Sequence, residues 1–447
     1  MPGAENLTLL TDLYQLTMAQ AYFREQRMGV ATFSLFVRSY PPNRGYFVSA
    51  GLEDVLDFLQ AFSFESTALD YLAEQKLFSD DFLHYLGDLK FTGAVWAIPE
   101  GRLFFTDEPV LEITAPIIEA QILETFVINQ IHLQTLIATK AARCVHAAGG
   151  RPLVDFALRR THGTDAGMKV ARTSYLAGFA GTSNLMAGSR YQIPVFGTMA
   201  HSFVSCFERE IDAFRAYVAS FPNHSTLLID TYDIIQGAHN AVKIAREMAR
   251  RGQKLLGVRI DSGDLAAQAR AVRKVFDDAN LPELKIVGSS GLDEFELAEL
   301  TRSNTPFDSY GIGTKMGMSA DAPWADMSYK LVEYERRPLL KLSPGKTSWP
   351  GKKQVFRMRD SEGKLVRDVI GLREENLAGE SLLKEVLRDG KILYRYPSLM
   401  ESRNLFAEEF AALPEGVKRI RDPSPYPVAF SAGLEALRQQ VTDLIQK

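Results

Sequence analysis

Short β-rich runs alternate with helical patterns between about residue 150 and residue 335, and this alternation restricts the fold more than any other feature. The β-rich runs lie at 153–156, 194–196, 226–230, 255–260, 285–288, 309–312 and 328–334. The clearest helical patterns lie at 166–180, 203–219, 234–251, 265–279 and 294–301. Such alternation indicates a parallel sheet, either doubly wound or closed into a barrel. At least six strands, with no Gly-x-Gly-x-x-Gly and no Walker loop, favour a (β/α) barrel.

The ends of these strands carry the residues that are suited to chemistry. In Gly-Thr-Met-Ala-His-Ser, at 197–202, His201 lies where a strand gives way to a helix. A histidine at this edge can move a proton or accept a phosphoryl group on nitrogen. The other strand ends bring Arg159 and Arg160, Asp230, Arg259 and Asp261, Ser289 and Gly291, and Gly313 and Thr314. In a barrel these ends converge on one face.

Each of these groups admits a structural and a functional interpretation. Glycine turns let backbone N–H groups approach a phosphate, arginines hold phosphates or carboxylates, and carboxylates bind Mg²⁺ or sugar hydroxyls. Taken alone, the Asp-Ser-Gly-Asp at 261–264 can be a turn and a helix cap, Arg159 can be solvated, and His201 can be a structural cap. Their recurrence at successive strand ends favours a site for a phosphorylated sugar whose anomeric carbon reacts.

The length of 447 residues exceeds what one simple core accommodates, so we expect several parts. These are an N-terminal α+β domain at 1–140, the barrel at 141–335, and a C-terminal segment at 336–447 that packs on both. The expected fold class is α/β, with an irregular (β/α) barrel resembling a TIM barrel and an α+β domain formed by the N-terminal part and C-terminal segments. Outside the barrel we predict helices at 13–22 (capped by Thr11-Asp12), 48–62, 69–86, 117–138 and 432–446, and strands at 30–38, 95–98 and 110–113.

Composition excludes several classes of protein. The net charge of −4 gives no overall attraction to nucleic acid or anionic membranes, so we expect neither as a partner. Two cysteines, Cys144 and Cys206, cannot build a disulfide framework or a cysteine-rich zinc site, which favours a reducing cytoplasm. The first ten residues lack a basic region before a long apolar run, so we expect no signal peptide. No uncharged run is long enough for a membrane helix.

Six motifs in order give the sequence a specific resemblance. They are 11–18 (TDLYQLTM), Phe156 with Arg159-Arg160, 197–202 (GTMAHS), 257–264 (GVRIDSGD), 310–314 (YGIGT), and 341–346 (KLSPGK) with 350–354 (PGKKQ). Together they resemble the nicotinate phosphoribosyltransferase family, in the type II phosphoribosyltransferase group. Some members of that family carry a cysteine-rich metal site, which this chain has too few cysteines to form.

The resemblance implies a reaction and a set of sites. The reaction joins nicotinate to phosphoribosyl pyrophosphate, giving nicotinate mononucleotide and pyrophosphate in NAD salvage, with ATP hydrolysis coupled through a phosphohistidine at His201. The implied catalytic residues are His201, Asp261 and Asp230; the nicotinate site is Tyr14, Phe156, Thr198 and Arg259; the phosphoribosyl pyrophosphate site is Arg159, Ser289, Gly291, Gly313 and Thr314. ATP would be a co-substrate, and Mg²⁺ would arrive with substrate rather than in a protein-fixed metal site. A cytoplasmic homodimer is implied, with Tyr14 reaching the active site of the neighbouring subunit.

Three alternatives remain open. A nicotinamide-using relative carries an acidic residue in its base pocket, whereas the corresponding loop here, 181–184, reads Gly-Thr-Ser-Asn. A non-catalytic sensor of pyridine nucleotides would have lost a reactive group, yet His201, Arg259 and Asp261 are all present. A sugar-phosphate lyase would want a strand-end lysine, for which Lys315 is the one candidate, or a metal set.

Overall fold

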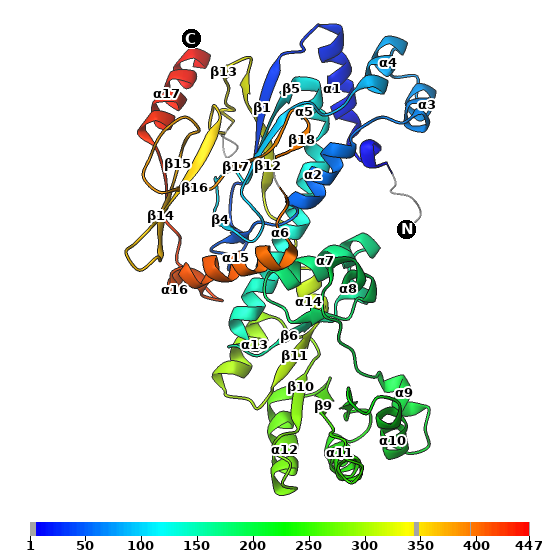
Figure 1. The fold of residues 1–447 in the computed structure, drawn as a ribbon. Coiled ribbons are helices and arrows are strands. Elements are labelled where there is room, and N and C mark those ends of the chain that lie inside the picture. Colours follow the sequence, from blue (N-terminus) through cyan, green and yellow to red (C-terminus); the bar gives the residue numbers. More distant parts are fainter. Residues whose placement is uncertain (1–5, 344–347, 394, 447) are drawn as a thin grey trace. The chain divides into compact units, whose positions relative to one another are not determined.

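The computed structural model describes residues 6–343, 348–393 and 395–446, and these form two compact units. One unit comprises Met1–Ala138 with Trp324–Lys447, and the other comprises Thr139–Pro323 (Figure 1). The N-terminal and C-terminal parts of the chain therefore share a unit, and the predicted boundary at 335 lies beyond the observed one. Pro344, Gly345 and Lys346 of the predicted 341–346 motif lie outside the described residues.

The unit Thr139–Pro323 is built on a parallel sheet, as the alternation predicts. Its strands, in the order in which they pair, are β7 (Gly181–Thr182), β6 (Leu153–Asp155), β11 (Ser309–Ile312), β10 (Lys285–Gly288), β9 (Gly257–Ile260) and β8 (Thr226–Leu228). Its helices are η2 (Leu158–Arg160), α7 (Thr164–Leu176), α8 (Leu185–Tyr191), α9 (His201–Ser205), α10 (Glu210–Ser220), α11 (Ile234–Ala249), α12 (Leu265–Asp278), α13 (Glu294–Arg302) and α14 (Thr314–Gly317). Helix α12 packs against β9 and β10 (Figure 1).

The strand order confirms the mixed α/β class but not a closed barrel. The last strand, β11, pairs with the first, β6, as cyclic order requires. Beyond β7 the sheet continues only as a single parallel bridge from Thr182 to Val195, where a strand at 194–196 was predicted. Pro194 has no N–H to donate, which limits pairing there. Among the described residues no ladder joins Val195 to β8, so barrel closure stays a prediction.

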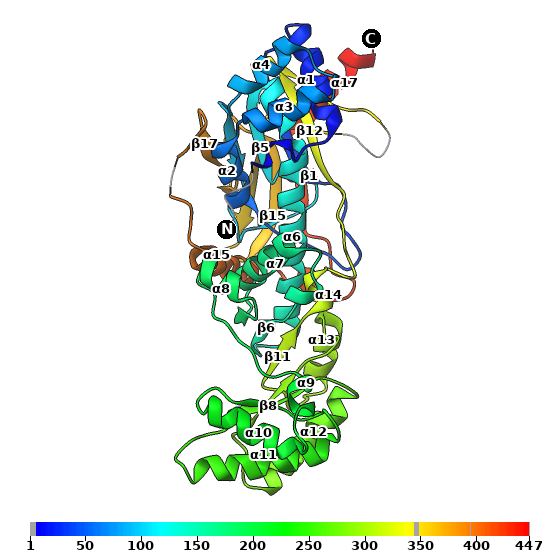
Figure 2. The ribbon, with the colours of Figure 1, turned by 90° about the vertical axis from the view of Figure 1, so that its right-hand side faces the viewer.

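The other unit holds a seven-stranded sheet whose central strands are antiparallel. In pairing order these strands are β13 (Arg337–Pro338), β12 (Met327–Tyr334), β1 (Val30–Val37), β5 (Leu111–Pro116), β3 (Ala94–Ala97), β17 (Lys384–Arg388) and β18 (Lys391–Ile392). Figure 2 shows β12, β1 and β5 side by side. The predicted run 328–334 was assigned to the barrel, and that assignment is wrong: it forms β12 and pairs with β1, a strand about three hundred residues earlier.

Several predicted helices of this unit are divided or shortened. The observed helices are η1 (Leu7–Leu9), α1 (Leu13–Arg24), α2 (Leu52–Ala61), α3 (Ser66–Glu74), α4 (Asp80–Asp88), α5 (Ile117–Ile122), α6 (Glu124–Ala147), α15 (Leu399–Ala412), α16 (Glu415–Lys418) and α17 (Ala432–Gln446). The run 69–86 breaks near Lys76, which adopts a left-handed φ of 56°. Asp12 is the N-cap residue of α1, as predicted, but its side chain accepts from Thr125 Oγ1 and makes no capping hydrogen bond. The C-terminal helix at 432–446 is confirmed. No helix within the described ranges has the length and apolarity that crossing a bilayer requires.

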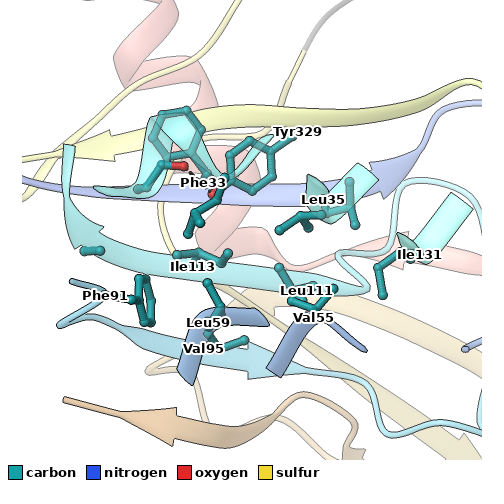
Figure 3. Packing of buried hydrophobic residues seen from close by; sticks show 14 of the residues in the cluster. Phe33, Leu35, Val55, Leu59, Phe91, Val95, Leu111, Ile113, Ile131 and Tyr329 are labelled. Atoms are coloured by element: carbon teal, nitrogen blue, oxygen red, sulfur yellow. Dashed lines mark hydrogen bonds between the residues drawn. The ribbon is translucent and has the colours of Figure 1, made fainter. Parts of the chain in front are cut away.

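The core of this unit lies between the seven-stranded sheet and its helices. Residues of β1, β3 and β5 pack against α2, α6 and β12; among them are Phe33, Leu35, Val55, Leu59, Val95, Leu111, Ile113, Ile131 and Tyr329 (Figure 3). The alternating side chains of a strand bury one apolar face, and this burial stabilises the fold by about 25 cal/mol per Å². Phe33 and Tyr329 stack with ring centroids 4.8 Å apart, which joins β1 to β12.

A smaller sheet in the same unit carries the C-terminal segment. Its strands pair in the order β16 (Glu380–Ser381), β14 (Lys353–Arg359), β15 (Leu365–Leu372) and β19 (Val428–Phe430), while β2 (Phe47–Val48) pairs with β4 (Leu103–Phe104). Lys353, from the 350–354 motif, lies buried 3.2 Å from Glu112 of β5, and Arg373 pairs with the same carboxylate. Lys353 of this motif therefore belongs to a buried ion cluster that connects β14 to β5.

Candidate functional site

His201 is the first residue of α9 and lies in the unit Thr139–Pro323. Its side chain is 44% exposed, so the ring is reachable by a ligand. Nδ1 lies 3.1 Å from Oγ1 of Thr231, which follows β8, and Nε2 lies 3.8 Å from a carboxylate oxygen of Asp261, which follows β9. The hydroxyl of Thr231 thus positions Nδ1, and Nε2 faces the carboxylate of Asp261 at the end of β9.

Arg259 of β9 forms the basic centre of the site. Its Nη1 donates to Thr198 Oγ1 at 2.6 Å, and its Nη2 lies 3.8 Å from Asp261 Oδ2. The side chain is 13% exposed, and its Nε has no hydrogen-bond partner among the described residues. Burial lowers the pKa of this guanidinium, although Asp261 and Asp230 oppose that effect. A guanidinium donates its N–H groups to a carboxylate, so an arginine with an unused N–H is suited to bind one.

Two carboxylates from neighbouring strand ends lie beside this centre. Asp230 Oδ2 accepts from the backbone N–H of Asp261 at 2.8 Å and from Ser262 Oγ at 2.7 Å. Ser289, directly after β10, donates its hydroxyl to Asp261 Oδ1 at 2.7 Å. The ends of β8, β9 and β10 are therefore joined by hydrogen bonds, as the sequence predicts from their order.

Phe156 lies across the end of β11. Its backbone N–H donates to Ile312 O at 2.7 Å, and its ring covers Gly311 so closely that a Cβ there would lie 2.4 Å from the ring. A Cβ at Gly313 would lie 3.4 Å from the Phe156 carbonyl. Gly311 therefore makes room for the aromatic ring of Phe156, so this glycine of the 310–314 motif has a packing role next to a residue predicted to bind nicotinate.

Of the residues predicted to hold phosphates, Arg159, Gly291 and Thr314 are exposed, whereas Ser289 is buried. Arg159 lies on η2, and its charge adds to the effect of burial in lowering the pKa of Arg259. After β10, Ser290 and Gly291 both adopt left-handed φ values, 91° and 61°. For serine this conformation is strained, and such strain is found at ligand-binding turns. Thr314 begins α14 on an exposed face.

Tyr14 is the one predicted site residue that belongs to the other unit. It lies in the first turn of α1 and is 50% exposed. Burial raises the pKa of its phenol, and the carboxylates of Glu124 and Asp12 raise it further. Its place in an active site stays a prediction.

Three further polar residues are not among those predicted from the sequence. Thr231 positions His201 through its hydroxyl. Asp155 accepts a hydrogen bond of 2.7 Å from Oγ1 of Thr182, a residue of the loop 181–184. Glu210 is a buried carboxylate at the start of α10. Burial raises the pKa of Asp155, whose two oxygens are already occupied by Thr182 and the N–H of Ala157. Asp155 and Thr231 could have been predicted from the sequence, because each is a polar residue within or directly after a short apolar strand.

The side chains of the site determine which metal ion could bind there. Among the described residues no group of three or more histidine, cysteine, aspartate or glutamate side chains could hold a metal ion. Asp230 Oδ1 is buried and finds no hydrogen-bond partner in the part of the chain that the structure describes, while Asp261 donates its backbone N–H to the other oxygen of that carboxylate. One or two carboxylates completed by substrate phosphates and water is the usual arrangement for Mg²⁺, so these residues fit that ion.

Three family profiles match consecutive parts of the chain. The nicotinate phosphoribosyltransferase N-terminal domain matches residues 9–132, the nicotinate phosphoribosyltransferase family matches 152–337, and the C-terminal domain matches 376–438. Among curated proteins, nicotinate phosphoribosyltransferase pncB2 of Mycobacterium tuberculosis is 48% identical over 95% of this chain and 91% of its own length. The Bacillus subtilis nicotinate phosphoribosyltransferase is 36% identical over 96% and 93%.

Solved structures agree with these matches. The crystal structure of human nicotinic acid phosphoribosyltransferase superposes with a TM-score of 0.88 at 31% identity, covering 96% of this chain and 99% of that one. A nicotinate-nucleotide pyrophosphorylase from Pyrococcus furiosus gives a TM-score of 0.75 at 23% identity, covering 92% and 97%, which shows a shared fold.

Proposed function

This chain belongs to the nicotinate phosphoribosyltransferase family, and on that premise we propose that it joins nicotinate to phosphoribosyl pyrophosphate. The ring nitrogen of nicotinate forms a bond to the anomeric carbon of the ribose, and the bond from that carbon to pyrophosphate breaks. The products are nicotinate mononucleotide and pyrophosphate, which serve NAD biosynthesis. The observation that carries the proposal is Arg259, buried beside Thr198 with its Nε free.

Base binding follows from the chemistry of nicotinate, which is flat, aromatic and anionic. Arg259 supplies the cation and Thr198 the hydroxyl that such a carboxylate requires, while Phe156 supplies an aromatic face. The loop 181–184 contains no acid, and the nearby Asp155 is held by Thr182 and by backbone. Nothing in this loop repels a carboxylate, which favours nicotinate over nicotinamide.

Displacement at the ribose carbon builds positive charge on the sugar and negative charge on the leaving pyrophosphate. Asp230 and Asp261 are the carboxylates able to stabilise the sugar, and Arg159 with the turns at Ser289–Gly291 and Gly313–Thr314 are the groups able to hold phosphates. Mg²⁺, when bound with the substrate beside Asp230 and Asp261, supplies further charge neutralisation of the pyrophosphate.

We assign the ATP-coupled step to His201. The terminal phosphoryl group of ATP is transferred to a ring nitrogen, releasing ADP, and water later removes it as inorganic phosphate. His201 Nε2 is the better candidate acceptor, because Nδ1 is engaged by Thr231. A phosphate there adds up to two negative charges near Asp261, a change that can alter the affinity of the site for pyrophosphate. A homodimer in which Tyr14 completes the neighbouring site belongs to the same proposal.

The test is a product assay. Pure protein is incubated with phosphoribosyl pyrophosphate, Mg²⁺ and either nicotinate or nicotinamide, with and without ATP, and the mononucleotide is identified by mass. We expect nicotinate to exceed nicotinamide by at least ~100-fold in kcat/KM, equivalent to about 2.7 kcal/mol, with stimulation by ATP. Equal use of the two bases would overturn the assignment of base.

A further inference from the structure

Thr182 is a fully buried threonine to which the proposed reaction gives no role. It is the second residue of the short strand β7. On one side it pairs with Asp155 of β6, and on the other it forms the parallel bridge to Val195. Asp155 directly precedes Phe156, and Val195 is followed three residues later by Thr198. Thr182 therefore lies between the two segments that carry the proposed contacts to nicotinate.

The backbone of Thr182 holds the segment that leads to Thr198. Its N–H donates to the Pro194 carbonyl at 3.0 Å, and its carbonyl accepts from the Phe196 N–H at 3.0 Å. Two residues after Phe196, the Thr198 hydroxyl accepts from Arg259 Nη1 at 2.6 Å. These backbone hydrogen bonds form with any residue other than proline at position 182, so they do not explain why the residue is a threonine.

The side chain of Thr182 holds the segment that leads to Phe156, and here the residue type matters. Its Oγ1 donates to Asp155 Oδ2 at 2.7 Å and accepts from the Asn184 N–H at 3.0 Å. Asp155 Oδ1 accepts from the Ala157 N–H at 2.8 Å and so closes a turn around Phe156. One carboxylate thus connects the hydroxyl of β7 to the turn that carries the aromatic ring.

This connection depends on the hydroxyl. A hydroxyl has one proton, which Thr182 donates to Asp155, and its oxygen keeps lone pairs with which it accepts from Asn184. Asp155 and Thr182 are both fully buried, where a polar group without a partner is costly. Valine at position 182 would remove the partner of both Asp155 Oδ2 and the Asn184 N–H, although it has nearly the same shape.

We propose that Thr182, acting through Asp155, is a positioning residue that fixes the spacing between Phe156 and the pair Thr198–Arg259. This inference rests on the proposed function, because it concerns the same nicotinate site. Nicotinate is flat and rigid, so its ring and its carboxylate fit one spacing between an aromatic face and a guanidinium. The spacing of the two segments then determines how well the base is bound.

The test compares variants of the full-length protein by steady-state kinetics and thermal unfolding. Thr182→Val removes the hydroxyl, Thr182→Ser keeps it, and Asp155→Asn replaces one acceptor oxygen by an amide NH₂. Thr173→Val is the matched control, because it removes an equally buried hydroxyl of α7 that donates to the Lys169 carbonyl at 2.7 Å. KM and kcat are measured for nicotinate and for phosphoribosyl pyrophosphate, and Tm is measured for each protein.

We expect Thr182→Val to raise KM for nicotinate about 10-fold and to change kcat less than ~2-fold, because the reacting groups are kept while their spacing is altered. KM for phosphoribosyl pyrophosphate should change much less, because the groups proposed to bind it, apart from Arg159, follow β10 and β11. Thr182→Ser should behave as wild type. Thr173→Val should keep the wild-type KM values even where its Tm falls.

Asp155→Asn should also raise KM for nicotinate, and it serves as the test if Thr182→Val does not fold. The double variant of Asp155→Asn and Thr182→Val should be no worse than the poorer single variant, because both substitutions break the same contact.

An unchanged KM for nicotinate in Thr182→Val, or equal increases in KM for both substrates, would overturn the inference and leave the transferase activity standing. Thr182→Ser or Thr173→Val with the kinetics of Thr182→Val would overturn it too, since the hydroxyl of Thr182 would then have no specific effect. A wild-type protein that forms no nicotinate mononucleotide would instead overturn the proposed function, and the inference with it.

Discussion

At the scale of single residues, the proposed function gives Arg259 and His201 different roles. Arg259 is buried and rigidly held by Thr198, which suits recognition of a fixed anionic group. His201 is half exposed and held at one nitrogen, which suits transient modification. The predictions for these two residues therefore concern different quantities, base selectivity for one and phosphoryl transfer for the other.

Replacing Arg259 by alanine should lower kcat/KM for nicotinate at least ~100-fold, because the buried cation that pairs with the carboxylate is lost. The preference for nicotinate over nicotinamide should collapse in the same variant, since the amide never used that charge. Steady-state kinetics with both bases checks this. Arg215→Ala, which removes an equal charge from an exposed ion pair with Glu247, is the control and should keep the wild-type ratio. Undiminished base selectivity in Arg259→Ala would refute the role.

Incubation with labelled ATP should place an acid-labile, base-stable phosphate on His201. His201→Ala should abolish both the label and the ATPase activity, yet leave slow synthesis without ATP, because displacement at the ribose does not formally require the phosphate. His224→Ala alters an exposed histidine and should label normally. Persistent labelling of His201→Ala at another residue would exclude His201 as the acceptor.

At the scale of elements, the close approach of Phe156 to β11 depends on Gly311. A methyl group there would lie 2.4 Å from the Phe156 ring, so Gly311→Ala should displace the ring and destabilise the protein by about 1–3 kcal/mol. KM for nicotinate should rise more than KM for phosphoribosyl pyrophosphate. Urea unfolding and kinetics measure the two effects. Gly197→Ala, where an added Cβ meets nothing within 4 Å, is the control for stability.

A second substitution separates packing from binding in that element. Phe156→Leu combined with Gly311→Ala should recover stability, because the smaller side chain makes room for the new methyl group, but should not recover nicotinate affinity. If the double variant regains full affinity, the aromatic ring of Phe156 has no part in binding the base.

The C-terminal sheet contains a buried ion cluster with its own pH dependence. Arg357 of β14 lies 2.6 Å from Asp368 of β15 and also pairs with Glu409 of α15. Burial, and then the charge of Asp368, raise the pKa of Glu108 well above its usual value. A raised carboxyl pKa means that the folded state holds the proton more tightly, so this contribution to stability is present below pH ~4.5 and is lost as pH rises through the folded pKa.

Glu108→Gln should therefore stabilise the protein increasingly as pH rises from 5 toward 8, because glutamine stays neutral and keeps an oxygen for the N–H of Phe105. Each unit of difference between the folded and unfolded pKa is worth about 1.4 kcal/mol. Urea midpoints of wild type and variant at several pH values give the difference directly, and other titrations cancel in the subtraction. A difference that does not change with pH would mean that Glu108 is ionised throughout.

At the scale of the whole molecule, the proposed homodimer makes a complementation experiment decisive. Tyr14→Ala and His201→Ala chains are mixed under conditions that exchange subunits. If sites are shared, one site of the heterodimer carries both lesions and the other carries neither, so ATP-coupled activity should rise toward about half per heterodimer. Absence of recovery, with exchange demonstrated by mass, would show that Tyr14 serves its own chain.

The sequence by itself determined the parallel sheet and the residues that stand at its strand ends. Strand–helix alternation is a local pattern, and parallel strands place their carboxyl ends at one edge. The approach of His201 and of Arg259 to Asp261, 3.8 Å in each case, agrees with that order. The 257–264 and 197–202 motifs indicated the family for the same reason, because each motif is a contiguous segment that can be recognised without knowing the fold.

Only the tertiary structure decided what depends on distant partners. The run 328–334 reads as one more strand, but its pairing with β1 follows from a contact that local periodicity does not encode. Lys353 of the 350–354 motif lies in a buried ion cluster with Glu112 of β5, a partner far away in the sequence. Segments far away in the sequence determine whether a side chain is buried and which partners it has. The local sequence, by contrast, determines where a strand runs and which residues stand at its end.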